Sequence, residues 1–321
     1  MNCLITGGAG YIGSVCADLL LHAGHTVSVI DDLRQGNADA VPDGAVFYHA
    51  QYGEKAVLHE VFDRHIDVVF HLAAEASVPR SMHNPGLFYE VNVCQGLSLL
   101  ETMRHHGCRI LIFSSTAAVF GEPITVPIDE HHPKNPCNPY GDSKLAFERL
   151  LRWYHECYGF RAHIFRYFNA AGATERHGES RPVEEHLIPR AFEALTGKRN
   201  QLTVFGNDYP TRDGTCVRDY LHVRDVAQAH LVSAEYLLQH DECDDFNLGS
   251  GTGTTVLELL DAIQRVTGRP VPYTIGGRRA GDPAVLVASS DKARQKLGLT
   301  FEHSTVDQIV SSAWRWVRKA G

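Results

Sequence analysis

The chain has 321 residues, of which 44% are hydrophobic and 21% are charged, as in an ordinary globular protein. Its formal net charge of -8 argues against nucleic-acid or membrane partners, so any anionic ligand must be held by local groups. No apolar run reaches the ~20 residues that a membrane span needs. The first residues read directly into a strand, so we predict no signal peptide.

Short apolar runs alternate with helical spacing along the first half of the chain. Strands are predicted over 3–6, 26–30, 67–72, 109–114 and 162–167, and helices over 12–23, 87–106 and 140–158. Repeated βα units of this kind predict an α/β fold, a Rossmann-type doubly wound parallel sheet.

After Asn169 the pattern loosens, and Gly, Pro and charged residues cluster over 172–182. Further helices are predicted over 187–196, 223–238, 255–266 and 305–317. We predict a cofactor-binding Rossmann domain over 1–168. Residues 169–321 are predicted to form mainly a smaller α/β substrate-binding domain, with some segments returning to the first domain.

Cysteine and histidine usage predicts no structural metal. The eight cysteines are scattered without a Cys-x-x-Cys pair, which favours a reducing, cytoplasmic setting. The nineteen histidines include no His-Glu-x-x-His motif or other ligand spacing. His71 ends an apolar run, and we predict a hydrogen-bonded strand-end residue rather than a ligand.

A glycine-rich turn follows the first predicted strand and opens the first helix. It carries Gly8-x-Gly10-x-x-Gly13 and, in another frame, Gly7-x-x-Gly10-x-x-Gly13. Glycines let the backbone approach a pyrophosphate, and the helix N-terminus supplies N–H donors. The predicted cofactor contacts are Gly7, Gly10, Tyr11, Ile12 and Gly13. The alternative is a glycine-rich turn without a ligand.

Asp31 ends the second predicted strand, where an acidic residue accepts hydrogen bonds from the adenosine ribose and repels a 2′-phosphate. This favours NAD over NADP as the cofactor. Arg34 is a mild signal in the opposite direction.

Tyr140 and Lys144 are four residues apart and share one face of a helix. A neighbouring ammonium stabilises a phenolate, and lowering the tyrosine pKa from about 10 to near 7 corresponds to ~4 kcal/mol. Thr116 follows the 109–114 strand, at the sheet edge where ligands bind, and its hydroxyl can position a substrate hydroxyl. The alternatives are a solvated helix face and a helix cap.

Taken together, the glycine turn, Ser115-Thr116 and Tyr140-x-x-x-Lys144 resemble the extended short-chain dehydrogenase/reductase superfamily. Three further segments, 166–172, 204–223 and 279–284, closely resemble the UDP-glucose 4-epimerase family. The resemblance covers essentially the whole chain, and 204–223 is its most specific part.

The resemblance implies roles by position. Thr116, Tyr140 and Lys144 match the family's catalytic Ser/Thr, base and activating lysine, and Lys144 also matches the residue that holds the nicotinamide ribose. The matches to UDP-sugar contacts are Asn169, Phe205, Arg218, Arg279 and Asp282. Arginines suit a diphosphate because they offer several donors and a permanent charge, although any single arginine can simply be solvated.

Three positions depart from the family pattern. Phe120 replaces the usual tyrosine of Val-Tyr-Gly, Gln51 replaces an adenine-binding aspartate, and Ala76 replaces a lysine found near the cofactor in some members. These departures concern individual cofactor contacts and not the reaction. The resemblance also implies a homodimer formed through the helices over 87–106 and 140–158.

The implied reaction is epimerisation at C4 of a UDP-sugar, UDP-galactose to UDP-glucose, through a 4-keto intermediate with tightly bound NAD. Related dehydratases carry Asp-Glu after the catalytic threonine, where this chain has Ala117 and Ala118, which cannot shuttle protons. A non-catalytic NAD-sensing protein typically lacks the Tyr/Lys pair. Leu286 matches a gate beside the sugar and is of intermediate size, so N-acetylated UDP-sugars are an alternative substrate. UDP-linked uronic acids and pentoses are further alternatives.

Overall fold

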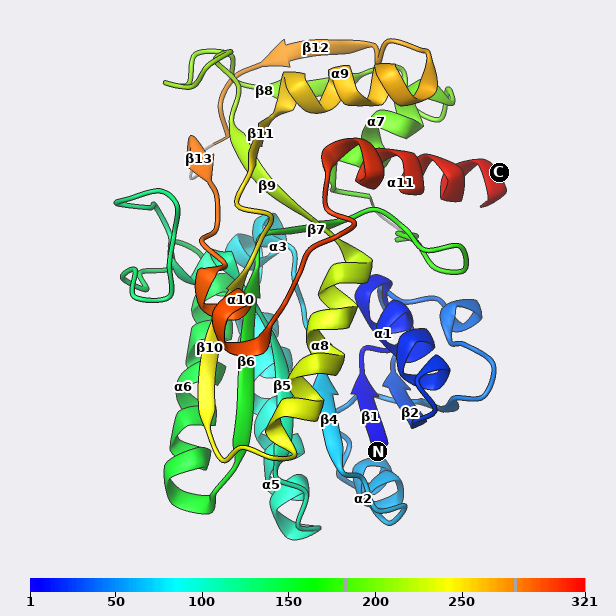
Figure 1. Cartoon of the computed structure of the whole chain (residues 1–321), viewed down its shortest axis with the longest axis vertical. Coiled ribbons are helices and arrows are strands. Elements are labelled where there is room, and N and C mark those ends of the chain that lie inside the picture. Colours follow the sequence, from blue (N-terminus) through cyan, green and yellow to red (C-terminus); the bar gives the residue numbers. More distant parts are fainter. Residues whose placement is uncertain (182–183, 280–281, 321) are drawn as a thin grey trace.

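Seven parallel strands form the large sheet of the computed structural model, which describes residues 1–181, 184–279 and 282–320 (Figure 1). The order β10-β6-β5-β4-β1-β2-β3 is that of a doubly wound Rossmann sheet, as predicted. The strands are β1 (Asn2–Thr6), β2 (Thr26–Asp31), β3 (Val46–His49), β4 (Val68–His71), β5 (Ile110–Thr116), β6 (Arg161–Tyr167) and β10 (Cys243–Leu248).

Helices cover both faces of this sheet because its strands are apolar on both sides. In β1, for example, Ile5 belongs to the core on one face and Leu4 to the core on the other. The first core is completed by α1 (Tyr11–His22), α8 (Val223–Leu237) and α10 (Asp291–Leu297). The second is completed by α2 (Lys55–Phe62), α5 (Gln95–His105) and α6 (Pro139–Tyr158).

The helix predicted over 87–106 is interrupted in the structure. After α3 (Val78–His83), α4 (Pro85–Tyr89) runs into a π-helical turn over Glu90–Cys94, and α5 continues from it. The bounds of the other predicted helices agree with the structure to within three residues. His71 is a buried strand-end residue whose Nδ1 lies 2.7 Å from Thr6 Oγ1, which confirms that prediction.

The second unit lies beyond the carboxyl ends of the large sheet's strands (Figure 1). Its central strand, β9, pairs with three others around a separate hydrophobic core. The strands are β7 (Asn169–Ala171), β8 (Leu202–Phe205), β9 (Val217–His222), β11 (Gly253–Thr255), β12 (Tyr273–Gly276) and β13 (Val285–Leu286). The helices are α7 (Leu187–Leu195), α9 (Val256–Thr267) and α11 (Val306–Ala320).

Two strands of the large sheet were not predicted. β3 is a short edge strand and is only partly buried, so its sequence lacks an unbroken apolar run. β10 carries Asp244 and Asp245, and two adjacent charges interrupt the apolar run that predicts a buried strand. In the structure Lys292 binds Asp244 and Arg166 binds Asp245, so both charges are tolerated in a strand.

Two stretches of the chain after residue 169 return to the large sheet. α8 and β10 form the first and α10 the second, and the exact division between the units stays a prediction. Parts of the predicted 172–182, 279–284 and 169–321 ranges lie outside the described residues, namely positions 182–183, 280–281 and 321. Within the described part of the chain, no helix has both the length and the apolar character of a membrane span.

Candidate active site

One large cavity, of about 1240 Å³, joins the sheet edge to the second unit. It opens where the strand order reverses between β1 and β4, the point at which doubly wound sheets bind ligands. Every predicted site residue lines it: Gly7, Gly10, Tyr11, Ile12, Gly13, Asp31, Thr116, Tyr140, Lys144, Asn169, Phe205, Arg218, Arg279, Asp282 and Leu286. Residues far apart in the sequence are therefore brought to one site.

The turn between β1 and α1 leaves no space for side chains. Gly7 has φ +76°, and a Cβ there would lie 2.6 Å from the Ala73 backbone nitrogen. A Cβ at Gly13 would lie 2.1 Å from the Gly7 carbonyl oxygen. Gly10 is the N-cap of α1 and offers no side-chain cap, so the first N–H groups of the helix remain available to an anion. The turn therefore fits the pyrophosphate of a dinucleotide.

Asp31 is held at the end of β2 by its own backbone neighbours. Its carboxylate accepts hydrogen bonds from the Ala9 N–H at 3.0 Å and the Leu33 N–H at 2.8 Å. Burial raises the Asp31 pKa, and these two bonds oppose the shift. Arg34 was the residue that spoke for NADP. Its guanidinium instead pairs with the carboxylates of Asp32 at 2.6 Å and Glu75 at 3.3 Å.

Thr116, Tyr140 and Lys144 reach the cavity from two elements. Thr116 is the last residue of β5. Tyr140 and Lys144 lie on α6, which begins after Asn138, whose side chain accepts a hydrogen bond from the Gly141 N–H at 2.9 Å. Lys144 is buried, and its Nζ donates to the Ser114 carbonyl oxygen at 2.9 Å. The capped helix and the strand end together place phenol, hydroxyl and ammonium around one space.

The expected lowering of the Tyr140 pKa is wrong for the chain alone. Burial raises the Tyr140 pKa, and a hydrogen bond with Thr116 opposes this only in part. Burial also lowers the Lys144 pKa to about 7, against the opposing effect of Glu148. The low-dielectric site disfavours both charged forms, an effect that the spacing of Tyr140 and Lys144 could not reveal.

A buried ion-pair network joins the helix that carries Tyr140 and Lys144 to the neighbouring strands. Arg166, on β6, donates from Nε and Nη2 to the Glu148 carboxylate at 2.9 and 2.6 Å, and from Nη1 to Asp245 at 2.5 Å. The Ser115 hydroxyl, next to Thr116, donates to Glu148 at 2.5 Å. Glu148 is one helical turn after Lys144. The network thus ties the helix of Tyr140 and Lys144 to the strand of Thr116.

The remaining predicted residues line the part of the cavity in the second unit. Arg218 forms an ion pair with Asp282, and the Arg279 guanidinium lies 3.9 Å from the centre of the Phe205 ring. Asn169 donates from Nδ2 to the Asp219 carbonyl oxygen at 3.0 Å. Both arginines thus have partners within the protein.

Sequence reasoning missed Arg190, on α7, which lines the same part of the cavity. Its Nε is buried and has no hydrogen-bond partner among the residues that the structure describes. Burial lowers the Arg190 pKa, with further effects from Arg199 and Arg279. Only its place in an amphipathic helix was visible in the sequence, and that place did not suggest a ligand.

The three departures from the family pattern lie in different surroundings. Phe120 is buried, and the Arg166 guanidinium lies 5.4 Å from its ring centre. Gln51 accepts a hydrogen bond from the Gln95 side chain at 3.1 Å. Ala76 alone of the three lines the cavity, where it adds no polar group.

A Rossmann sheet, a glycine turn and a Tyr/Lys pair in one cavity are the features of a dinucleotide-dependent enzyme of the short-chain dehydrogenase/reductase type. The family model described as "NAD dependent epimerase/dehydratase family" matches residues 3–249, and the chain belongs to this family, whose cofactor is NAD.

Known proteins resemble the chain over its whole length. The UDP-glucose 4-epimerase of Halalkalibacterium halodurans is 44% identical over 319 residues, which cover 98% of this chain and 95% of the relative. The crystal structure of UDP-glucose 4-epimerase from Brucella ovis in complex with NAD matches with a TM-score of 0.95 and 41% identity, covering 98% of both chains. The corresponding enzyme from Bifidobacterium longum, in complex with NAD+ and UDP, matches with a TM-score of 0.94 and 34% identity over 99% of this chain and 98% of that one.

Proposed function

We propose that this chain interconverts UDP-galactose and UDP-glucose by reversible oxidation at C4 of the sugar. The observation that carries the proposal is the shared cavity, in which Thr116, Tyr140 and Lys144 lie together with arginines of the second unit. The similarity to UDP-glucose 4-epimerases over nearly the whole length supports the same activity.

The residues of the chain divide between proton transfer and binding. Tyr140 removes the proton from the sugar 4-hydroxyl and returns it after the sugar has turned, and Thr116 hydrogen-bonds that hydroxyl. Gly7, Gly10 and the first turn of α1 hold the NAD pyrophosphate. When bound, oxidised NAD supplies an acceptor for the C4 hydride and a positively charged ring.

The other end of the substrate needs firm attachment because the keto sugar must present both faces. Arg218 and Arg279 bind the diphosphate, and Arg190 adds a third guanidinium. Ala117 and Ala118 line the cavity where a dehydratase needs an acid and a base, so elimination of water is disfavoured. N-acetylated UDP-sugars are the second substrates to test, because Leu286 is an intermediate size for the gate beside the sugar.

The test combines purified protein with UDP-galactose and follows UDP-glucose by chromatography. We expect interconversion by the wild type and a loss of at least ~100-fold in Tyr140→Phe, the typical size of a general acid–base contribution. The variant should still copurify with NAD. The bound NAD is measured by its absorbance after denaturation of the protein releases it. Tyr273→Phe, at an exposed position that does not line the cavity, is the control. No interconversion by NAD-loaded wild type would refute the proposal.

We also propose a homodimer formed through α5 and α6, in the cytoplasm. Leu97, Trp153 and Tyr158 are exposed by 42%, 67% and 48% on these helices, an apolar surface that suits a partner subunit. All eight cysteines are free, in keeping with a reducing compartment. Light scattering after size exclusion should give twice the chain mass, and Trp153→Glu should give the monomer.

A further inference from the structure

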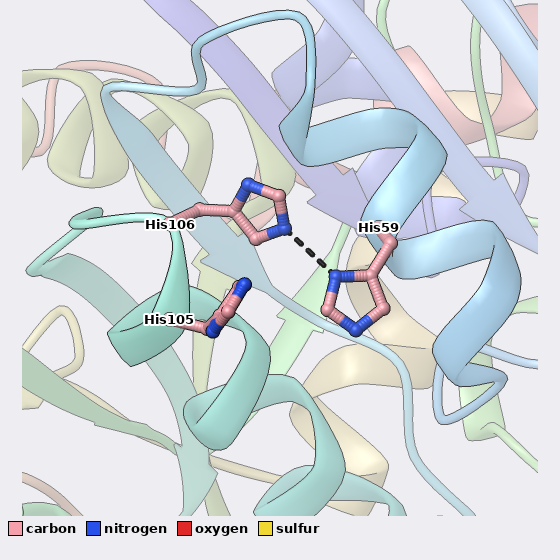
Figure 2. Close-up of side chains that lie close together, drawn as sticks. All are labelled: His59, His105 and His106. Atoms are coloured by element: carbon pink, nitrogen blue, oxygen red, sulfur yellow. Dashed lines mark hydrogen bonds between the residues drawn. The ribbon is translucent and has the colours of Figure 1, made fainter.

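Three histidines gather at the surface far from the cavity. His59 lies on α2, His105 is the last residue of α5, and His106 is its C-cap (Figure 2). None of the three lines the active-site cavity. The three histidines therefore take no part in the reaction at C4.

One ring nitrogen of each imidazole lies close to a ring nitrogen of each of the other two. His59 Nδ1 and His106 Nε2 lie 2.8 Å apart, and one ring nitrogen from each histidine lies within 4.8 Å of those of the other two (Figure 2). Zinc–imidazole bonds of about 2.0–2.1 Å place two ligands on one ion roughly 3.3 Å apart at the tetrahedral angle. Binding of one ion therefore requires side-chain rotations that part His59 and His106 slightly and hold His105 at a similar distance from both.

Packing between α2 and α5 holds the two helices that carry the cluster. Leu58, next to His59, and Met103 belong to the same buried core. The His106 ring stacks on Phe62 with a centroid distance of 5.8 Å. The backbone positions are thus fixed by the fold, and a ligand has only to select side-chain rotamers.

An acidic side chain stands on the far side of His106. Asp63 Oδ1 lies 3.8 Å from His106 Nδ1, the ring nitrogen that faces away from His59. Metal-binding histidines commonly direct their second N–H to a carboxylate, which fixes the tautomer with Nε2 free to bind. The alternative to a metal site is a simple hydrogen bond between His59 and His106. That alternative does not account for the position of the exposed His105.

We propose that His59, His105 and His106 form a surface site for one first-row transition-metal ion, of which Zn²⁺ is the probe. Three neutral imidazoles suit zinc, copper, nickel or cobalt, and water completes the coordination. Each histidine keeps its remaining ring proton on the nitrogen that faces away from the ion. Mg²⁺ and Ca²⁺ are disfavoured because they need several oxygen ligands.

The test measures Zn²⁺ binding by isothermal titration calorimetry on the tag-free, NAD-loaded full chain. We expect one ion per chain, no heat with Mg²⁺, and affinity weakened at least ~100-fold in His59→Ala, since removing a ligand costs more than removing an outer-sphere partner. His105→Ala, at an exposed position, gives the same test if His59→Ala fails to fold. Epimerisation without added metal should be unchanged in both variants.

His131→Ala is the matched control, because His131 is also exposed and lies in another part of the chain. Its Zn²⁺ affinity should equal that of the wild type. Equal Zn²⁺ binding by wild type and both cluster variants, or no stoichiometric binding by the wild type, would overturn the proposal.

Discussion

Replacing Arg166 with methionine should destabilise the chain strongly while leaving its surface unchanged. Arg166 is 1% exposed and binds Glu148, which is 2% exposed, and Asp245, which is 10% exposed. The variant leaves the buried Glu148 carboxylate without its cation and leaves Asp245 with the exposed Arg152. Removing one partner of a buried ion pair typically costs ~3–5 kcal/mol, most of it from the unpaired charge that remains.

Arg152 provides the matched control, because it pairs with Asp245 but is 46% exposed. Arg152→Met should cost below ~1 kcal/mol, as exposed ion pairs do. Urea unfolding followed by tryptophan fluorescence measures both differences in the free energy of unfolding. Adding Glu148→Gln to Arg166→Met should recover part of the loss, because it removes a buried charge. Equal costs for Arg152→Met and Arg166→Met would refute the reasoning.

Three further results should follow. Gly13→Ala, whose Cβ would lie 2.1 Å from the Gly7 carbonyl oxygen, should lose ~1–3 kcal/mol of stability and copurify with less NAD; unchanged NAD content would contradict the proposed turn. Arg190→Leu should raise KM for UDP-galactose ~10–100-fold with little change in kcat. An unchanged KM would show that Arg190 does not contact the substrate. Although burial opposes it, Arg166 holds the pKa of Asp245 below its usual value. The stabilisation of the fold by this ion pair should therefore be complete above about pH 4, the pKa of an aspartate in the unfolded chain, and be lost as the pH falls through the lower pKa of the folded state. This pH dependence of the free energy of unfolding should be weaker in Arg166→Met.

Much of the fold was predictable because local patterns and tertiary structure agree. Buried parallel strands are apolar on both faces, so β1, β4 and β5 stand out in the sequence. β10 does not, because its aspartates are paired by cations that come from other elements, and such pairing leaves no local pattern. An edge strand such as β3 is similarly hidden by its partial exposure.

The candidate site divides in the same way. The glycine turn and the Tyr140–Lys144 spacing were visible because each depends on neighbours in sequence. The raised Tyr140 pKa and the buried Nε atom of Arg190 depend on packing between distant segments, which no local spacing encodes. His59 and His106 are close only because α2 and α5 pack together, so a search for ligand spacing misses them.

The position of β10 also bears on how the chain is made. β6 ends at Tyr167, yet the strand that pairs with it, β10, spans Cys243–Leu248. During synthesis from the N-terminus, β6 therefore has an unpaired edge while the next 75 residues emerge from the ribosome. Such an edge invites pairing with other nascent chains, and the cationic Arg166 within it lacks Asp245 throughout that interval. The interval between the synthesis of β6 and that of β10 is therefore the stage at which this edge is open to other chains.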